Sequence, residues 1–232
     1  MENLVIVGIG KTADFIYEFV CHHRLYNVIG FAVNLSYIKD NTQTFKGLPV
    51  YALETIKKDL AHNKFKVFVA VMWHKLNSDR KSLFEYCESN GFEMASLVSP
   101  NAVIMRNAKY GKNCYIGDFT ILKPGVFVED DCYFLGNNIV GEYSHVEKHV
   151  FMAFQSVTGG YVRIGTQSFI GMHATVNEHT VVGDKCIIGS GVTIRRNVPP
   201  YTSVSMTDAP LKVRTYNEET IENKLRADIV PR

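Results

Sequence analysis

The residues best suited to hold a phosphate lie near the start of the chain, where an apolar run ends in Gly8-Ile9-Gly10. Residues 3–7 predict a buried strand, and the residues that follow, through His23, predict a helix. Glycines at such a turn let backbone N–H groups approach a phosphate, and the helix N-terminus favours an anion. The second predicted strand ends at Val33-Asn34 without an acidic residue, which argues against recognition of an NAD ribose. An ordinary turn between a strand and a helix would show the same two glycines.

A six-residue period then runs without interruption through the middle of the chain. Its sixteen positions are Ile104, Tyr110, Ile116, Leu122, Val128, Phe134, Val140, Val146, Met152, Thr158, Ile164, Ile170, Val176, Val182, Ile188 and Ile194. All except Thr158 are apolar or aromatic, and half are followed by glycine. Because a period of six fits neither an α-helix nor a two-faced strand, it predicts a short strand and a turn that repeat. Stacking such units places their apolar residues in one continuous core.

Composition narrows the class of protein. The 232 residues are 46% apolar with a net charge of +2, and no basic run is interleaved with aromatic residues, so no nucleic-acid partner is expected. The first residues lack a charged leader, and no apolar run is long enough to cross a bilayer, so we expect no membrane insertion. The five cysteines show no CxxC spacing, which predicts neither disulfides nor a metal site and fits the cytoplasm. Three of them, Cys114, Cys132 and Cys186, share one place in the period and are expected to pack inside the coils.

The elements around the repeat are predicted in chain order. Residues 26–34, 64–73 and 93–98 predict further strands, residues 41–60 a loop and then a short helix after Tyr51, and residues 77–92 a helix capped by Asn77 or Ser78. Strands that alternate with helices indicate a small parallel α/β sheet over about residues 1–97. Residues 98–200 form the repeat, which we expect to end at Pro199-Pro200. Residues 201–232 form a tail with a helix over 215–228.

Three phrases of the repeat resemble a known family: YIGDFT (115–120), RIGTQSFIGMHATV (163–176) and VVGDKCIIGSGVTI (181–194). They look like the hexapeptide-repeat acyltransferases, whose left-handed parallel β-helix has triangular coils of three hexads. The chain from about residue 3 to 200 resembles the nucleotide-sugar acetyltransferases of the NeuD/PglD-like family, which place a Rossmann-like domain before the β-helix. The resemblance implies that fold class, a homotrimer, acetyl-CoA as co-substrate and a nucleotide-linked amino sugar, with UDP, dTDP or GDP left open.

The resemblance also carries binding sites over to this chain. The nucleotide site would comprise Gly8, Gly10, Lys11, Thr12 and Asn34. Relatives usually have histidine in place of Thr12 and an acidic residue near Asn34, so the nucleotide stays open. The CoA arm would contact Gly160, Met172 and Ser190, and its phosphates could pair with Arg195 and Arg196.

The catalytic position departs from the family. Where relatives carry the histidine that acts as general base, this chain has Glu142, followed by Tyr143, and a second family histidine is replaced by Gln155. Four hypotheses follow. Glu142 could be the general base, or a displaced histidine could take this role. The amine substrate could also need no protein base, or the activity could be lost or changed. Of the histidines, His173 lies one coil of eighteen residues after Gln155, and His145 and His149 are also at outward positions.

Outward residues should stack in columns eighteen residues apart. Tyr143, Tyr161 and His179 would form an aromatic ladder, and Gly160 would leave room beside Glu142 for a thin substrate. We therefore expect an acetyl-CoA-dependent N-acetyltransferase of a nucleotide-linked amino sugar, which would serve O-antigen or capsule biosynthesis. The alternatives are a sugar or sialic acid O-acetyltransferase and a non-catalytic subunit that binds nucleotide sugar. Nitrogen ranks first because an amine can be neutral near working pH.

Overall fold

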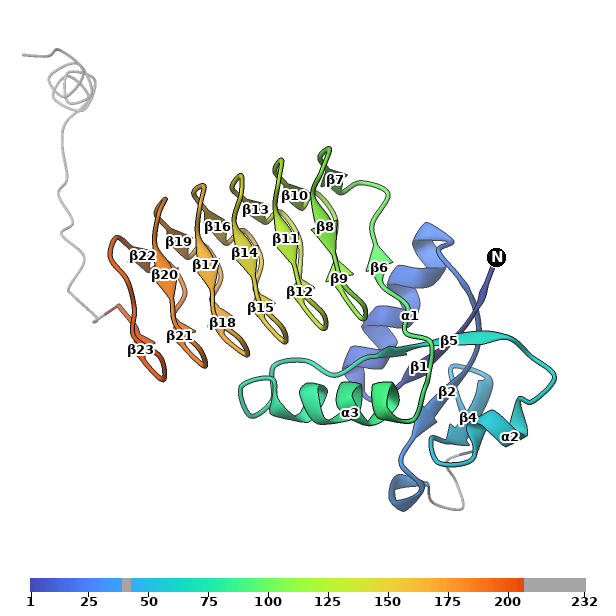
Figure 1. Ribbon diagram of the computed structural model, residues 1–232. Helices are drawn as coiled ribbons and strands as arrows, with labels where there is room; N and C mark the ends of the chain where they lie inside the picture. Colours follow the sequence, from blue (N-terminus) through green and yellow to red (C-terminus); the bar gives the residue numbers. More distant parts are fainter. Residues whose placement is uncertain (39–42, 207–232) are drawn as a thin grey trace, which may run out of the picture.

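The computed structural model describes residues 1–38 and 43–206, and its first part is an α/β unit (Figure 1). Its sheet has the order β3-β4-β2-β1-β5. All neighbours are parallel except the short pair β3/β4. The strands are β1 (Asn3–Val7), β2 (Asn27–Val33), β3 (Thr44–Phe45), β4 (Leu48–Ala52) and β5 (Phe65–Val69), and the helices are α1 (Lys11–His23), η1 (Leu35–Tyr37), α2 (Ile56–Asp59) and α3 (Ser78–Ser89). The four parallel strands have the order of half a Rossmann sheet.

The helices cover the two faces of this sheet separately. Side chains of α1, such as Ile16 and Val20, pack on one face with Leu4 and Ile6 of β1. Residues of α2 and α3 pack on the opposite face. Because β1 is buried on both faces, it reads as a continuous apolar run, which is typical of a central parallel strand.

The second part is a triangular prism built from strands of two residues (Figure 1). Its three parallel sheets form the walls of the prism, and we name each wall after the number of strands that it contains. The seven-strand wall contains β6 (Leu97–Val98), β9 (Tyr115–Ile116), β12 (Tyr133–Phe134), β15 (Phe151–Met152), β18 (Phe169–Ile170), β21 (Ile187–Ile188) and β23 (Ser203–Val204). The six-strand wall contains β7 (Val103–Ile104), β10 (Ile121–Leu122), β13 (Ile139–Val140), β16 (Val157–Thr158), β19 (Thr175–Val176) and β22 (Thr193–Ile194). The five-strand wall contains β8 (Lys109–Tyr110), β11 (Phe127–Val128), β14 (His145–Val146), β17 (Arg163–Ile164) and β20 (Val181–Val182).

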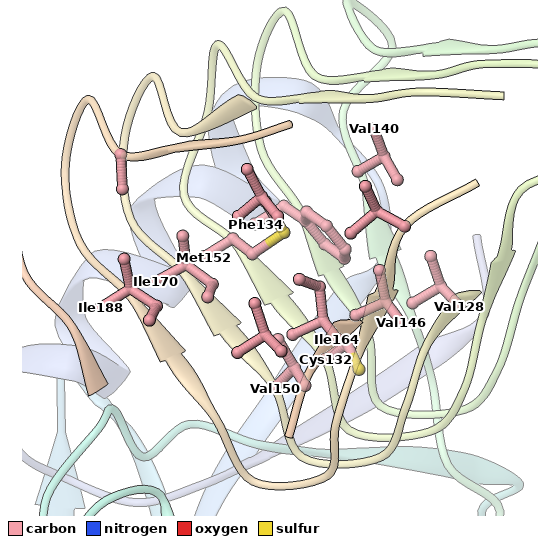
Figure 2. Packing of buried hydrophobic residues seen from close by; sticks show 14 of the residues in the cluster. Val128, Cys132, Phe134, Val140, Val146, Val150, Met152, Ile164, Ile170 and Ile188 are labelled. Atoms are coloured by element: carbon pink, nitrogen blue, oxygen red, sulfur yellow. The ribbon is translucent and has the colours of Figure 1, made fainter. Parts of the chain in front are cut away.

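The six-residue period is confirmed as the inward residue of each strand from β7 to β22, and Figure 2 shows part of the core that these side chains form inside the prism. Cys114, Cys132 and Cys186 are buried in the same core, as expected. Thr158 is also buried, and its hydroxyl accepts a hydrogen bond from the Gly141 N–H. Tyr110 is the exception: it is 42% exposed, because β8 is the last strand of its wall and no coil lies beneath it.

The α/β unit and the prism share one interface. Tyr115, Tyr133 and Phe151, which point outward from the seven-strand wall, lie in the same apolar cluster as α1 and β1. At the edge between the five- and seven-strand walls, Arg80 of α3 donates to the Asp131 carboxylate over 3.0 Å, with both side chains fully buried. Hydrophobic packing and a buried ion pair therefore hold the two parts together.

Three predictions for individual segments were wrong in whole or in part. Residues 44–52, expected within a loop, form the hairpin β3–β4, and β4 extends the parallel sheet. Residues 93–98, expected as a fourth strand of that sheet, divide between the two parts: Met94 makes a parallel bridge to Val67 of β5, whereas Leu97–Val98 pair with β9 and begin the prism. The prism also continues past the paired prolines, because a shortened turn lets Val204 pair with Ile188, where the eighteen-residue spacing would have placed Met206. Asn77 is the N-cap residue of α3, as one of the two predicted alternatives, but its side chain makes no capping hydrogen bond.

The expected helix over 215–228 lies outside the described residues. Among the residues that the structure describes, no helix combines the length and the apolar character needed to cross a membrane.

Candidate functional site

A cavity of about 450 Å³ lies at the carboxyl ends of β1 and β2, with α3 on its far side. Gly8 lines it with φ at +131°, and a Cβ at this residue would lie 3.0 Å from the Ala70 carbonyl oxygen. Glycine is therefore required by both the backbone conformation and the contact. Crevices at the carboxyl ends of parallel strands are where open α/β sheets bind ligands.

The start of α1 follows this cavity directly. Gly10 precedes the helix with no side-chain cap, and Lys11 and Thr12 form its first turn. Because the first N–H groups of a helix lack partners within it, they are free to bind an anion. The cavity walls include Gly8 and Asn34 but none of Gly10, Lys11 and Thr12, so the structure places the five predicted nucleotide residues in two adjoining groups.

One acidic side chain beside Asn34, that of Glu54, was not predicted from the sequence. The amide of Asn34 donates to Glu54 over 3.4 Å, and the other carboxylate oxygen of Glu54 accepts from the Leu35 N–H over 2.9 Å. Glu54 follows β4, so recognising it required the hairpin that the sequence reading missed. An acidic group thus stands beside the end of β2 although β2 itself supplies none.

Lys75 and Asp79, from the opposite side of the cavity, were also not predicted. Their side chains approach within 3.5 Å of each other. A hydrogen bond from His74 and the charge of Lys75 lower the pKa of the Asp79 carboxyl. The cavity therefore combines one cation, Lys75, and one carboxylate, Asp79, with an apolar base, which is a lining that suits a polar, charged small molecule.

The predicted catalytic position Glu142 lies on the prism edge between the six- and five-strand walls, which we call the Glu142 edge. A Cβ on Gly160 would lie 2.8 Å from one Glu142 carboxylate oxygen, so this side chain rests against the Gly160 backbone. Glu178 lies on the same edge, one coil beyond Gly160. Arg195 and Arg196 follow β22, where this edge ends. Within residues 1–38 and 43–206, the Glu142 carboxylate has no hydrogen-bond or ion-pair partner, so it is available to a ligand.

The aromatic ladder beside Glu142 is present. The rings of Tyr143 and Tyr161 stack at 5.3 Å between centroids, and those of Tyr161 and His179 at 4.9 Å. All three residues have φ between 55° and 58°, the left-handed conformation that turns the chain at each corner. Stacking occupies most ring faces, which supports a packing role for Tyr143.

Gln155 and His173 stand one coil apart, as the eighteen-residue spacing predicted, on the edge between the seven- and six-strand walls. Both are exposed, with Met172 beside His173 and Ser190 one coil further. We call this the His173 edge. In a single chain it is a different edge from that of Glu142, so the predicted base and CoA residues divide into two groups that one copy does not bring together.

The other two histidines have partners. His145 points outward from β14, where its Nε2 lies 2.7 Å from Glu129 and its ring stacks on Phe127. His149 is buried, against the expectation of an outward position, because α3 covers that edge, and its Nδ1 lies 2.8 Å from Asp131. His149 therefore belongs to the joint between the two parts and is closed to a substrate.

No group of histidine, cysteine or acidic residues in the described part of the chain has the arrangement of a metal site. All five cysteines are free thiols.

Comparison with known proteins identifies the repeat and the fold. Residues 161–196 match the model of the bacterial transferase hexapeptide (six repeats). A search of curated protein sequences finds no match. Among solved structures, a point mutant of perosamine N-acetyltransferase from Caulobacter crescentus, in complex with CoA and GDP-perosamine, has a TM-score of 0.76 at 20% identity, with 88% of this chain and 93% of that chain covered.

Two further structures are similar over nearly the whole chain. The acetyltransferase domain of PglB from Neisseria gonorrhoeae FA1090, in complex with acetyl coenzyme A, has a TM-score of 0.74 at 22% identity, covering 87% of this chain and 95% of that one. WeeI from Acinetobacter baumannii AYE has a TM-score of 0.54 at 17% identity, covering 88% and 96%. These likenesses confirm the predicted fold class, a Rossmann-like unit followed by a left-handed parallel β-helix, and the resemblance on which it was based.

Proposed function

We propose that this chain, which carries hexapeptide repeats behind a Rossmann-like unit, is an acetyl-CoA-dependent N-acetyltransferase of a nucleotide-linked amino sugar. The observation that carries the proposal is the joining, in one chain, of a cavity at strand carboxyl ends to a hexapeptide prism. The same architecture extends over 88% of the chain in a structure that holds CoA and GDP-perosamine. The cavity would take the nucleotide, and the prism would take acetyl-CoA.

In the proposed reaction the sugar amine attacks the thioester carbonyl carbon. A C–N bond forms, the carbonyl oxygen takes negative charge, and collapse of the tetrahedral intermediate breaks the C–S bond and releases CoA as a thiolate. The nitrogen loses one proton, to a protein base or to solvent, and the thiolate regains one. Backbone N–H groups beside the bound thioester would stabilise the oxyanion.

The proton acceptor is proposed to be Glu142. Its carboxylate is unpaired and lies beside the small Gly160, where a substrate can approach. A groove that closes over this carboxylate would exclude water from it and favour its acceptance of a proton. His173, which is exposed on the other edge, is the second candidate, and a neutral amine would need neither. Tyr143 and His145 rank lower, because one is stacked in the ladder and the other is held by Glu129.

The proposed assembly is a homotrimer in which the Glu142 edge of one copy faces the His173 edge of the next. This arrangement would bring Glu142 and Gly160 of one chain towards Met172, His173 and Ser190 of its neighbour. Arg195 and Arg196 would then lie at the end of the shared groove, where they could bind CoA phosphates. Sedimentation equilibrium tests the assembly: a monomer at micromolar concentration would contradict the site as drawn.

The proposed location is the cytoplasm, where acetyl-CoA and precursors of surface glycans such as O-antigen or capsule are available. Five free thiols fit a reducing compartment.

The test is release of CoA from acetyl-CoA with UDP-, dTDP- and GDP-linked amino sugars, for the wild type, Glu142→Gln and His173→Gln. Glu178→Gln is the matched control, because it removes a carboxylate from the same edge one coil beyond Gly160. Loss of turnover in Glu142→Gln alone would identify the base. Equal turnover in all variants would show that the amine arrives neutral, and no turnover with any sugar would overturn the proposal and favour a binding subunit.

A further inference from the structure

A second cavity, of about 540 Å³, lies between the segment after β5 and the outer face of the seven-strand wall. Met72, Trp73 and Leu76 form one side of it, and Phe169 and Ile187, which point outward from β18 and β21, form the other. Trp73 is 50% exposed and Ile187 is 42% exposed. We call this space the Trp73 cleft. Five of its seven lining residues are apolar or aromatic, and the other two are His74 and Lys75.

The Trp73 cleft has a rigid aromatic side. The Trp73 ring meets Phe151 edge-on at 5.1 Å between centroids and Phe169 at 6.3 Å. The two phenylalanines stack on each other at 5.3 Å with their rings nearly parallel. Packing of this kind fixes the indole and leaves part of its surface facing the open cleft, which is how apolar small-molecule sites are usually lined.

The Trp73 cleft adjoins the cavity at the carboxyl ends of β1 and β2. Lys75 lines both of them. His74, which lines the cleft, is hydrogen-bonded to Asp79, which lines the cavity. A ligand that fills the cavity with its nucleoside and passes Lys75 with an anionic diphosphate therefore enters the Trp73 cleft with whatever the diphosphate carries.

The segment between the two spaces has a strained backbone. Lys75, Leu76 and Asn77 are three consecutive non-glycine residues with φ between 48° and 64°. The β-helix holds them in place: the Gln167 side chain donates to the Leu76 carbonyl over 2.9 Å and to the Ser78 hydroxyl over 2.8 Å. Strained conformations that the surrounding structure enforces cluster at ligand sites. Here the three strained residues lie between Trp73, which lines the cleft, and Asp79, which lines the cavity.

We propose that the Trp73 cleft is the subsite for the sugar ring of the nucleotide-linked substrate, with the indole against an apolar face of that ring. The inference rests on the proposed function and deepens it. The strands that carry Phe169 and Ile187 run directly into the His173 edge, at Met172 and Ser190. A sugar held here would present its amine towards His173 of the same chain, where a groove with a second copy would supply Glu142.

Trp73 is the only tryptophan of the chain, so tryptophan emission reports on this cleft alone. The experiment titrates the full-length protein with GDP, UDP and dTDP and with their amino-sugar conjugates, GDP-perosamine among them. Calorimetry measures binding, and emission with acrylamide quenching measures the exposure of Trp73. We expect nucleoside diphosphates to bind with little change at Trp73, and the matching nucleotide sugar to shift its emission to the blue and reduce its quenching severalfold.

A variant pair separates the sugar from the nucleotide. Phe169→Ala should weaken binding of the nucleotide sugar about tenfold, a change of about 1.4 kcal/mol, and leave nucleoside diphosphate binding unchanged. Phe127→Ala, which removes an outward aromatic ring from the five-strand wall, is the control and should change neither.

Three outcomes are distinguishable. A response at Trp73 to the sugar conjugate but not to the nucleoside diphosphate supports the proposal. Binding of both with identical emission and quenching overturns the sugar subsite and leaves the proposed function standing. Failure of every nucleotide and conjugate to bind folded protein overturns the proposed function, and this inference with it.

Discussion

Replacing Asp131 with alanine should weaken the whole molecule, because this one carboxylate joins the α/β unit to the prism. One oxygen accepts from Arg80 Nε over 3.0 Å and lies 2.8 Å from His149 Nδ1, and the other accepts from the Asn113 amide over 2.7 Å. Arg80 also donates to the backbone carbonyls of Asp131 and His149 over 3.0 Å. Alanine would leave a fully buried guanidinium without its counter-charge.

The size of the effect follows from this geometry. At an effective dielectric constant of about 20, two unit charges 3.0 Å apart attract by about 5 kcal/mol. Loss of one partner of a buried ion pair typically costs about 3–5 kcal/mol. We therefore expect the free energy of unfolding of Asp131→Ala to fall by about 3–5 kcal/mol.

Equilibrium urea unfolding, followed by Trp73 emission and by circular dichroism, measures this change. Glu85→Ala is the control, because Glu85 pairs with Lys81 over 3.6 Å on the surface of the same helix, α3, and should cost less than about 1 kcal/mol. The double variant Arg80→Ala/Asp131→Ala should lose less than the sum of the single variants. A loss below about 1 kcal/mol for Asp131→Ala would refute the view that this pair holds the two parts together.

Three further predictions concern the site and the core. Gly8→Val should abolish nucleotide binding and cost about 1–3 kcal/mol, since its φ of +131° excludes a side chain; calorimetry that finds unchanged affinity would disprove this. Gly160→Ala should displace the Glu142 carboxylate and lower kcat more than it raises KM for acetyl-CoA, and a change in KM alone would contradict it. In native protein at pH 8, iodoacetamide should label the exposed Cys21 before the buried Cys87. Burial raises the pKa of the Cys87 thiol to about 12, so this thiol stays protonated until the pH approaches that value. Equal labelling of both cysteines, measured by mass spectrometry, would contradict the burial of Cys87.

The prism could be predicted from the sequence because the same six-residue pattern of one inward apolar residue repeats along it. Each six-residue unit places one residue of the period in the core, and fifteen of the sixteen positions are apolar or aromatic, which fixes the register in which they face inward. The columns on its outside followed from the same spacing, including the ladder at Tyr143 and the pairing of Gln155 with His173. The exception is Tyr110, which lies on the last strand of its wall, where no further coil covers it.

The interface between the α/β unit and the prism could not be predicted, because it depends on contacts between segments far apart in the chain. Arg80 reads as an ordinary charged residue of an exposed helix, and His149 as an outward residue of a coil. Each is buried only because α3 lies on that edge of the prism. Leu97–Val98 were assigned to the wrong sheet for the same reason: two apolar residues fit either sheet, and only tertiary pairing decides.

Some residues of the candidate nucleotide cavity could be predicted from the sequence. Gly8 and Asn34 do line the cavity, because carboxyl ends of adjacent parallel strands must meet. Glu54, Lys75 and Trp73 were not predicted, since they come from a hairpin and a strained segment that carry no periodic signal.

The most direct test of the central claim is identification of the reaction product. The full-length protein is incubated with acetyl-CoA and GDP-, UDP- and dTDP-linked amino sugars, and the sugar product is analysed by mass spectrometry and NMR. We predict one new acetyl group per sugar, bound through an amide nitrogen, with one equivalent of free CoA. An ester-linked acetyl group would show an O-acetyltransferase, and no acetylated sugar from folded protein that binds both ligands would contradict the account.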